Sequence, residues 1–138
     1  MKIRLMLYAM LMVMAPALCL AGDVIVIVNK SVSESSLDQK FIKSIYLGKK
    51  TSWNDGSNIT FVVLNGDVHD TFLKKYVGKK ASQFNAFWKK QIFTGKGIPP
   101  KKLDSEKAMV EFVAQTPGAI GYVSANAKVA NVKTITVK

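Results

Sequence analysis

Two short runs of apolar, mostly β-branched residues place the strongest constraint on how this chain can fold. Residues 23–29 (DVIVIVN) and 59–64 (ITFVVL) do not alternate strictly between polar and apolar positions. Strands of this kind are typical of a sheet that is covered on both faces, as in α/β proteins. Because helical patterns separate the runs, the sequence predicts an α/β fold with a largely parallel or mixed sheet.

Apolar residues at helical spacing predict the helices of this fold. The first predicted helix, residues 37–46, is capped by Ser36 and ended by Gly48, and the second runs from about Asp67 to Gly78. The third follows Ser82 as its N-cap and carries Phe84, Phe87 and Trp88 into the core. The fourth runs from Asp104 or Ser105 to about Gln115. A turn is expected at 53–56, and further strands at 119–123 and 134–137, the last at an edge of the sheet. Gly118 and Gly121 are expected to serve backbone geometry and close packing.

The first 21 residues predict a cleavable signal peptide. Lys2 and Arg4 precede an uncharged apolar run, residues 5–20, which is shorter than the roughly 20 residues of a membrane-spanning helix. Small residues at positions 19 and 21 suit cleavage after Ala21. We therefore expect an exported, periplasmic protein with one domain, residues 22–138; an uncleaved anchor is the alternative.

Removal of this segment would change the chemistry open to the protein. The only cysteine, Cys19, would leave with it, which excludes disulfides, thiolate chemistry and cysteine metal sites. Of 20 basic residues 18 would remain, all of them lysine, against nine acidic residues. Without arginine the domain has no bidentate guanidinium clamp for phosphate. The lysines could raise the local concentration of anions, but we expect no nucleic-acid partner, since only the net charge favours one.

Several segments resemble the phosphate-binding proteins of ABC transporters. The segments that carry the resemblance are 24–29 (VIVIVN), 45–49 (IYLGK), 53–55 (WND) and 117–123 (PGAIGYV), in matching order and spacing. The resemblance implies a type 2 periplasmic-binding-protein fold, a three-layer αβα sandwich. Members of the family have two lobes with the anion in the cleft between them, whereas this chain resembles one lobe. It is most similar to short members that share 92–97 (IFTGKG) and 99–100 (PP).

The turn after the second strand, residues 64–71 (LNGDVHDT), is the first candidate ligand site. A helix N-terminus attracts anions, and the resemblance implies that phosphate binders grip their ligand here through an arginine and a Ser-Gly-Thr group. Neither is present in this chain. The residues we predict to bind ligand in this turn are Asn65, Gly66, His69 and Thr71. If His69, the only histidine, is exposed, mild acid could charge it and help it to hold an anion; the alternative is a histidine without a role.

The alternative for this turn is purely structural. Asp67 would then cap the helix and Asp70 would interact with its dipole, two carboxylates that oppose an anion. One histidine beside these two carboxylates falls short of a usual metal-ligand set, so we expect neither a metal nor a cofactor.

A glycine-rich loop is the second candidate site. The predicted ligand-binding residues in it are Thr94, Gly95 and Lys96, which offer a hydroxyl, close backbone approach and a mobile charge. It is not a P-loop, because the Gly-Lys-Ser/Thr ending is absent. The alternative is a loop that simply ends the preceding helix, with Gly95 following its last turn.

These features favour a periplasmic module that binds phosphate or another small oxyanion, linked to ABC-type phosphate transport with a permease as partner. The alternative is a non-catalytic interaction protein of the envelope that has kept the fold and lost tight binding. A lone lobe cannot close over a ligand, which favours weak binding, a homodimer or another partner. We expect no enzyme, since the sequence has no Gly-x-Ser-x-Gly elbow and no nucleophile–base pair.

Overall fold

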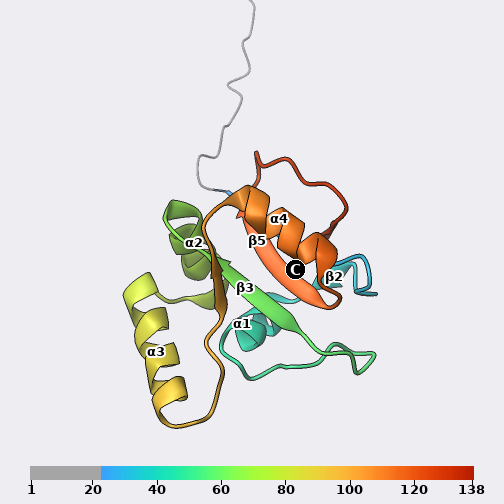
Figure 1. The fold of residues 1–138 in the computed structure, drawn as a ribbon. Coiled ribbons are helices and arrows are strands. Elements are labelled where there is room, and N and C mark those ends of the chain that lie inside the picture. The colour runs from blue at the N-terminus through green and yellow to red at the C-terminus, as the bar shows by residue number, and fades with distance from the viewer. Residues whose placement is uncertain (1–22) are drawn as a thin grey trace, which may run out of the picture.

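The computed structural model describes residues 23–138 (Figure 1). The predicted signal peptide, residues 1–21, lies outside the described residues. The strands are β1 (Val24–Val28), β2 (Ser36–Leu37), β3 (Thr60–Leu64), β4 (Lys101–Leu103), β5 (Ala119–Ser124) and β6 (Lys133–Val137). The helices are α1 (Gln39–Tyr46), α2 (Asp67–Phe72), which continues as a π-helical segment η1 (Leu73–Val77), α3 (Ala81–Phe93) and α4 (Glu106–Gln115).

The six strands form one mixed sheet in the order β2-β6-β1-β5-β3-β4. β1 runs antiparallel to both β5 and β6, whereas β3 runs parallel to β5 and β4, and β2 parallel to β6. The predicted α/β class with a mixed sheet is confirmed. β1 and β5 are almost entirely buried, as expected for apolar strands covered on both sides.

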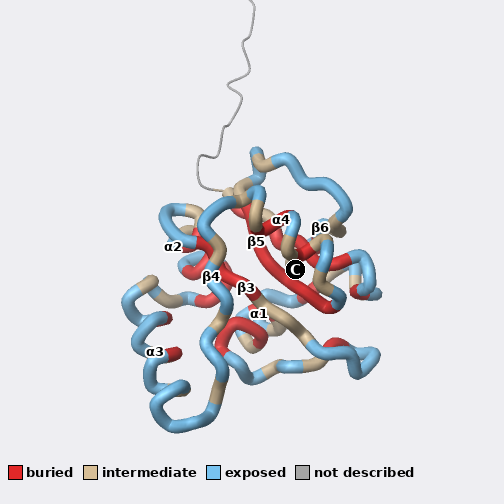
Figure 2. The backbone as a smooth tube through the Cα atoms, in the orientation of Figure 1, coloured by how far each residue is buried: buried red, intermediate tan, exposed pale blue. Residues whose placement is uncertain are grey.

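Helices cover both faces of this sheet. Successive side chains along a strand point to opposite faces: Gly121 of β5 lies against Met109 of α4, while Tyr122 stacks on Phe72 of α2, with ring centroids 3.8 Å apart. Tyr46 of α1 packs on the same face as Tyr122. The three-layer αβα arrangement is therefore confirmed, and Figure 2 shows the buried strands between exposed outer surfaces.

The start of the first helix differs from the prediction. Leu37 lies in β2 rather than in a helix, and α1 begins at Gln39 with Asp38 as its N-cap residue. The cause is pairing with the C-terminal strand, because the Leu37 carbonyl accepts a hydrogen bond from the Lys138 N–H at 2.9 Å. This partner is a hundred residues away in the sequence, so local spacing could not reveal it.

Two other predicted caps also move. Gly66 rather than Asp67 occupies the N-cap of α2, and Lys80 rather than Ser82 that of α3. The Gln83 side chain accepts a hydrogen bond from the Lys80 N–H at 3.0 Å, which fixes the earlier start of α3. Ser105 caps α4, as predicted, through a hydrogen bond from the Ala108 N–H to its hydroxyl.

The edges of the sheet were also predicted incompletely. β6 is not an edge strand, since it lies between β1 and the two-residue β2. The other edge is β4, which pairs in parallel with β3 and places Lys102 beside Val63. Its sequence, Lys-Lys-Leu, lacks the β-branched residues that signal a strand, and it forms because β3 offers an unpaired edge. This strand positions the candidate site.

Candidate functional site

The turn between β3 and α2 is the edge where α/β sheets commonly bind ligands, beyond the carboxyl ends of the strands. Asn65 is exposed there, and its amide donates a hydrogen bond to Asp104 at 3.2 Å. Gly66 adopts a positive φ of 82° that starts α2, and Thr71 lies half-buried along this helix. Asp67 and Asp70 are exposed in this turn, and Asp104 is exposed and hydrogen-bonded to Asn65, so this edge carries negative charge that opposes an anion.

The glycine-rich loop ends α3 and is separate from this turn. The Thr94 hydroxyl donates to the Lys90 carbonyl at 2.8 Å, and the Gly95 and Lys96 N–H groups bind carbonyls of the last turn. Gly95 has a φ of 70°, as the structural alternative predicted. The polar groups of this loop therefore terminate the helix. The structure does not bring Thr94, Gly95 and Lys96 together with Asn65 around one hollow.

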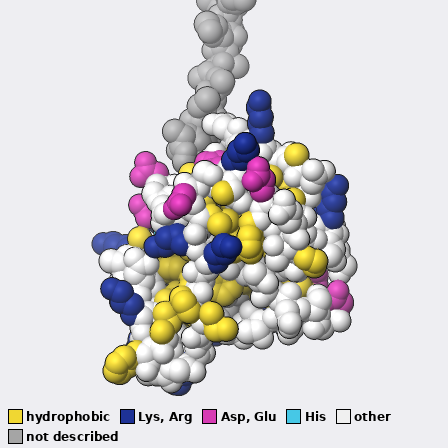
Figure 3. Space-filling view, viewed as in Figure 1, with side chains coloured by type: hydrophobic (Ala, Val, Ile, Leu, Met, Phe, Trp, Pro, Cys, Tyr) yellow, Lys and Arg dark blue, Asp and Glu magenta, His cyan; other side chains and the backbone are white. Residues whose placement is uncertain are grey.

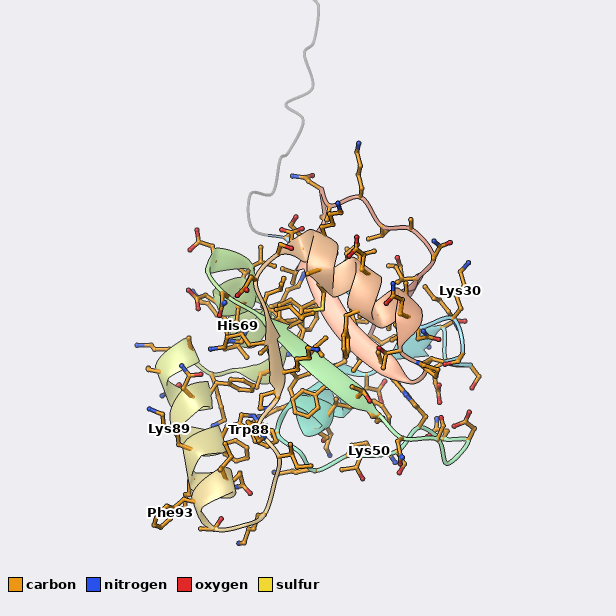
Figure 4. All side chains as sticks on the ribbon, viewed as in Figure 1. Lys30, Lys50, His69, Trp88, Lys89 and Phe93 are labelled. Carbon is orange, nitrogen blue, oxygen red and sulfur yellow. The ribbon has the colours of Figure 1, made fainter. Side chains whose placement is uncertain are left out.

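His69 does not meet the condition under which mild acid would charge it at the surface. It is buried, with 6% of its surface exposed. His69 lines a groove of about 280 Å³ between α3 and the strands β3 and β4. Figure 4 labels His69 and two residues of α3 that also line this groove, Trp88 and Lys89. The groove is lined by Val63, His69, Phe84, Asn85, Trp88, Lys89, Ile92, Pro99, Pro100 and Lys102. One of the predicted site residues, His69, thus meets two lysines that were not predicted.

A hydrogen-bond relay assigns the tautomer of His69. The Leu64 N–H donates to the Tyr122 hydroxyl at 2.9 Å, and that hydroxyl in turn contacts Nδ1 of His69. The hydroxyl has no other acceptor among the residues that the structure describes, so its proton goes to Nδ1. Burial raises the pKa of Tyr122, which keeps this proton in place. The remaining proton of a neutral imidazole must then lie on Nε2.

His69 is neutral in the folded protein at neutral pH. Burial lowers the pKa of His69 below its ordinary value; Asp70 raises this pKa and Lys102 lowers it, both by less than burial does. Nδ1 accepts from Tyr122, and no described residue accepts a hydrogen bond from Nε2. The imidazole, which lines the groove, therefore has one N–H group without an acceptor among the described residues.

The lysines of the groove are placed by strand geometry. Lys102 and Val63 are neighbours in register and point to the same face of the sheet, toward α2 and α3. Lys101 points to the opposite face, where its ammonium lies 4.8 Å from the ring centroid of Phe112 in α4. Only one member of this lysine pair thus serves the groove. Side chains alternate between the two faces of the sheet along a strand. A prediction of residues 101–103 as a strand would therefore have placed Lys101 and Lys102 on opposite faces.

Two larger hollows lack a comparable fixed donor. One, of about 640 Å³, lies between η1 and the start of α3, with Asp70, Lys74, Lys79 and Lys80 among its lining residues. The other, of about 680 Å³, lies between α4 and residues 127–131. Neither is lined by a buried polar side chain. The groove beside His69 is the candidate site because a buried donor and mobile cations converge on it.

Residues 23–138 contain no cluster of three or more His, Cys, Asp or Glu side chains that could hold a metal ion. Nor does any helix within them combine the length and the hydrophobicity that crossing a bilayer requires.

Acid is expected to destabilise the fold through His69. The unfolded chain takes up a proton near the ordinary histidine pKa, whereas buried His69 does so only at lower pH. Stability is therefore complete above the unfolded-state pKa and falls as the pH decreases through it toward the folded-state value. Thermal unfolding at pH about 7.5 and about 5.5 should show a larger drop in midpoint for the wild type than for His69→Asn. Asparagine keeps an acceptor near Nδ1 without titrating, and equal drops would contradict this assignment.

The chain is similar in fold to known substrate-binding proteins. Residues 14–137 match the model of the PBP superfamily domain. A putative phosphate ABC transporter substrate-binding protein from Clostridium perfringens, solved with bound phosphate, is 23% identical with a TM-score of 0.67, and the match covers 83% of this chain and 44% of that protein. PstS from Borrelia burgdorferi is 12% identical with a TM-score of 0.66, over 84% of this chain and 47% of that one. An ABC-type phosphate transport receptor from Vibrio cholerae is 16% identical with a TM-score of 0.58, over 83% and 46%.

The match to solved structures is one of fold. The chain spans less than half the length of each of these proteins. The search of curated proteins gave no match. Since the family model covers nearly all of the described sheet and helices, the chain belongs to the PBP superfamily, with the fold found in phosphate-binding proteins of ABC transporters.

Proposed function

We propose that this chain is an exported solute-binding module that holds phosphate or another small oxyanion in the groove beside His69. The single observation that carries the proposal is that buried His69 lines the groove while the relay from Leu64 through Tyr122 holds its Nδ1. From this relay we infer that Nε2 carries the proton that a ligand would accept. Because the Tyr122 hydroxyl fixes the ring, this donor requires no reorganisation when an anion arrives.

Charge in and around the groove supports an anionic ligand. Lys89 and Lys102 line the groove together with the buried imidazole, and Asn85 adds an amide. Charge-assisted hydrogen bonds from such donors are stronger than neutral ones. No acidic residue lines this groove, in contrast to the strand-end edge with Asp67, Asp70 and Asp104. The groove therefore suits an oxyanion better than the turn that the sequence favoured.

The wider role rests on the relatives. Two of the solved relatives, from Clostridium perfringens and Vibrio cholerae, are described as phosphate-binding components of ABC transport. We extend this to the chain as part of the proposal: residues 1–21 direct export, the domain works in the periplasm, and it passes its ligand to an ABC permease. Binding rather than catalysis is proposed because the only hydrogen bond of His69 to a described side chain is with Tyr122, which leaves no nucleophile for it to activate.

Isothermal titration with inorganic phosphate tests the proposal. At pH about 7 and low salt we expect a dissociation constant on the order of 1 mM, equivalent to about −4 kcal/mol, because the groove stays open on one side. His69→Asn should weaken binding about tenfold or more, since it removes the Nε2 donor and keeps an acceptor for Tyr122. Lys102→Gln should weaken binding by a similar factor.

Lys101→Gln is the matched control for these variants. It removes the same charge one residue away, but its side chain lies on the opposite face, over Phe112. Its affinity should stay within about twofold of the wild type. Equal losses in Lys101→Gln and Lys102→Gln would show a general charge effect rather than a site. No heat with phosphate or sulfate at any accessible concentration would remove the oxyanion from the proposal.

Two surface features favour a second candidate, an interaction protein on a solute-binding fold. The strand-end edge is acidic, while large apolar side chains are exposed at the end of α3. A fold that had lost tight ligand binding could keep such a surface for a partner. Absence of phosphate binding by the folded wild-type protein would favour this candidate.

A further inference from the structure

The end of α3 and the loop that follows it expose large apolar side chains to solvent. We call residues 89–102 the α3 tip. Phe93 is 93% exposed, Ile98 is 85% exposed and Ile92 is 44% exposed. They are three of the four large hydrophobic residues exposed in residues 23–138, the fourth being Val129. A cluster of this kind in a soluble domain marks an interaction surface.

The α3 tip is also strongly basic. Residues 71–103 contain nine lysines and no acidic residue. The five lysines within the tip are Lys89, Lys90, Lys96, Lys101 and Lys102. The acidic side chains of the domain lie elsewhere, on the strand-end edge and on other elements. Phe93 and Ile98 thus lie in a segment whose only charged residues are lysines.

The shape of the tip is convex. The loop turns sharply at Gly95, with a φ of 70°, and its polar groups are used to end α3. Phe93 projects away from the body of the protein at the end of α3 (Figure 4). In the space-filling view, hydrophobic surface in this region is flanked by lysine side chains (Figure 3). Exposed apolar side chains at a protruding end are suited to insertion into an apolar layer rather than to lining a ligand pocket.

We propose that the α3 tip binds the surface of an anionic lipid membrane. Phe93 and Ile98 enter the boundary between head groups and acyl chains, where burial of apolar area stabilises them. The surrounding lysines contact lipid phosphates and keep their ammonium groups in the head-group layer. This holds whether or not the groove beside His69 takes phosphate, because Phe93 and Ile98 do not line that groove.

Charge argues against a second copy of the chain as the occupant. In a symmetric contact between two copies the tip lysines would face each other, and like charges opposed across an interface disfavour association. An anionic bilayer has the complementary charge, and its fluid surface adapts to a convex tip. An acidic protein would offer the same charge, and the experiment below separates it from lipid.

Vesicle flotation tests the proposal with lipid as the only partner. The purified protein should float with vesicles that contain about 30% phosphatidylglycerol and remain unbound with pure phosphatidylcholine. Raising NaCl from about 50 to about 300 mM should weaken binding. Phe93→Ser with Ile98→Ser should lower the partition coefficient about tenfold or more, whereas Val129→Ser, the matched exposed control, should leave it unchanged. Lys89→Gln with Lys90→Gln should also lower it, and Lys40→Gln with Lys43→Gln should have less effect.

A local reporter makes the result independent of other membrane-binding segments. In Phe93→Trp the emission of the new tryptophan should shift to the blue with phosphatidylglycerol vesicles and be quenched by brominated lipid, while buried Trp53 and Trp88 of the wild type respond little. Flotation that survives Phe93→Ser with Ile98→Ser, or a reporter that does not respond, overturns the proposal. Protein that floats with neither vesicle type also overturns it, and would assign the α3 tip to a protein partner instead.

Discussion

Replacement of Trp88 by alanine is expected to lower the free energy of unfolding by about 3–5 kcal/mol, a large part of the total for a domain of this size. Trp88 is buried in α3 and packs against Phe61, Phe84 and Phe87. Its indole N–H donates to the carbonyl of Tyr46 at 3.1 Å. The substitution removes a large apolar volume and leaves that buried carbonyl without its donor.

Trp88 also sets the approach of two loops to α3. A Cβ at Gly48 or at Gly97 would lie 3.0 Å from the Trp88 ring, so both glycines are in close contact with it. The loops cannot collapse into the vacated space without moving α1 or the end of α3. Because Trp88 lines the groove beside His69, its loss should also abolish phosphate binding under conditions where the variant remains folded.

Urea unfolding followed by far-ultraviolet circular dichroism measures the effect, with Phe93→Ala as the matched control. Phe93 lies in the same helix and is also a large aromatic residue, but it is 93% exposed. Its replacement should change the free energy of unfolding by no more than about 0.5 kcal/mol. A loss below about 1 kcal/mol in Trp88→Ala would mean that α3 is not held to the sheet by this side chain.

Replacement of Gly118 by alanine is expected to cost about 3–5 kcal/mol for a different reason, backbone strain. Gly118 has a φ of 76°, a conformation that residues with a Cβ rarely adopt. The added Cβ would overlap the backbone carbonyl oxygen of Asn58. Relief by a shift is difficult, because the Gly118 carbonyl accepts hydrogen bonds from the Trp53 indole at 2.9 Å and from the Thr60 N–H at 3.2 Å.

Gly56→Ala separates the overlap from the dihedral angle. Gly56 has a φ of 87°, but nothing lies within 4 Å of an added Cβ. Its replacement should cost only the left-handed penalty of about 1–2 kcal/mol. The same urea experiment compares the two variants. Equal losses at both positions would show that the contact with Asn58 contributes nothing and that this turn can relax.

The elements of the fold were largely predictable because their signals are local. The runs at 24–28 and 60–64 form strands, since β-branched side chains suit an extended backbone that is covered on both faces. Gly78 ends the helix before it with a φ of 71°, as its position in the sequence indicated. Where a distant partner decides the conformation, the prediction failed: Leu37 became a strand through β6, and Lys101–Leu103 through β3.

For the candidate site, too, local features were predictable and contacts between distant residues were not. The sequence by itself determined that the domain has lysines and no arginine, one histidine at the start of a helix and an α/β sheet around which to arrange them. Only the tertiary structure decided that His69 is buried, that Lys102 rather than Lys101 joins it, and that the Thr94–Lys96 loop does not. The relay that orients His69 joins two side chains 53 residues apart. Spacing along the chain specifies which faces neighbouring residues share, but packing across the sheet specifies which distant donors meet.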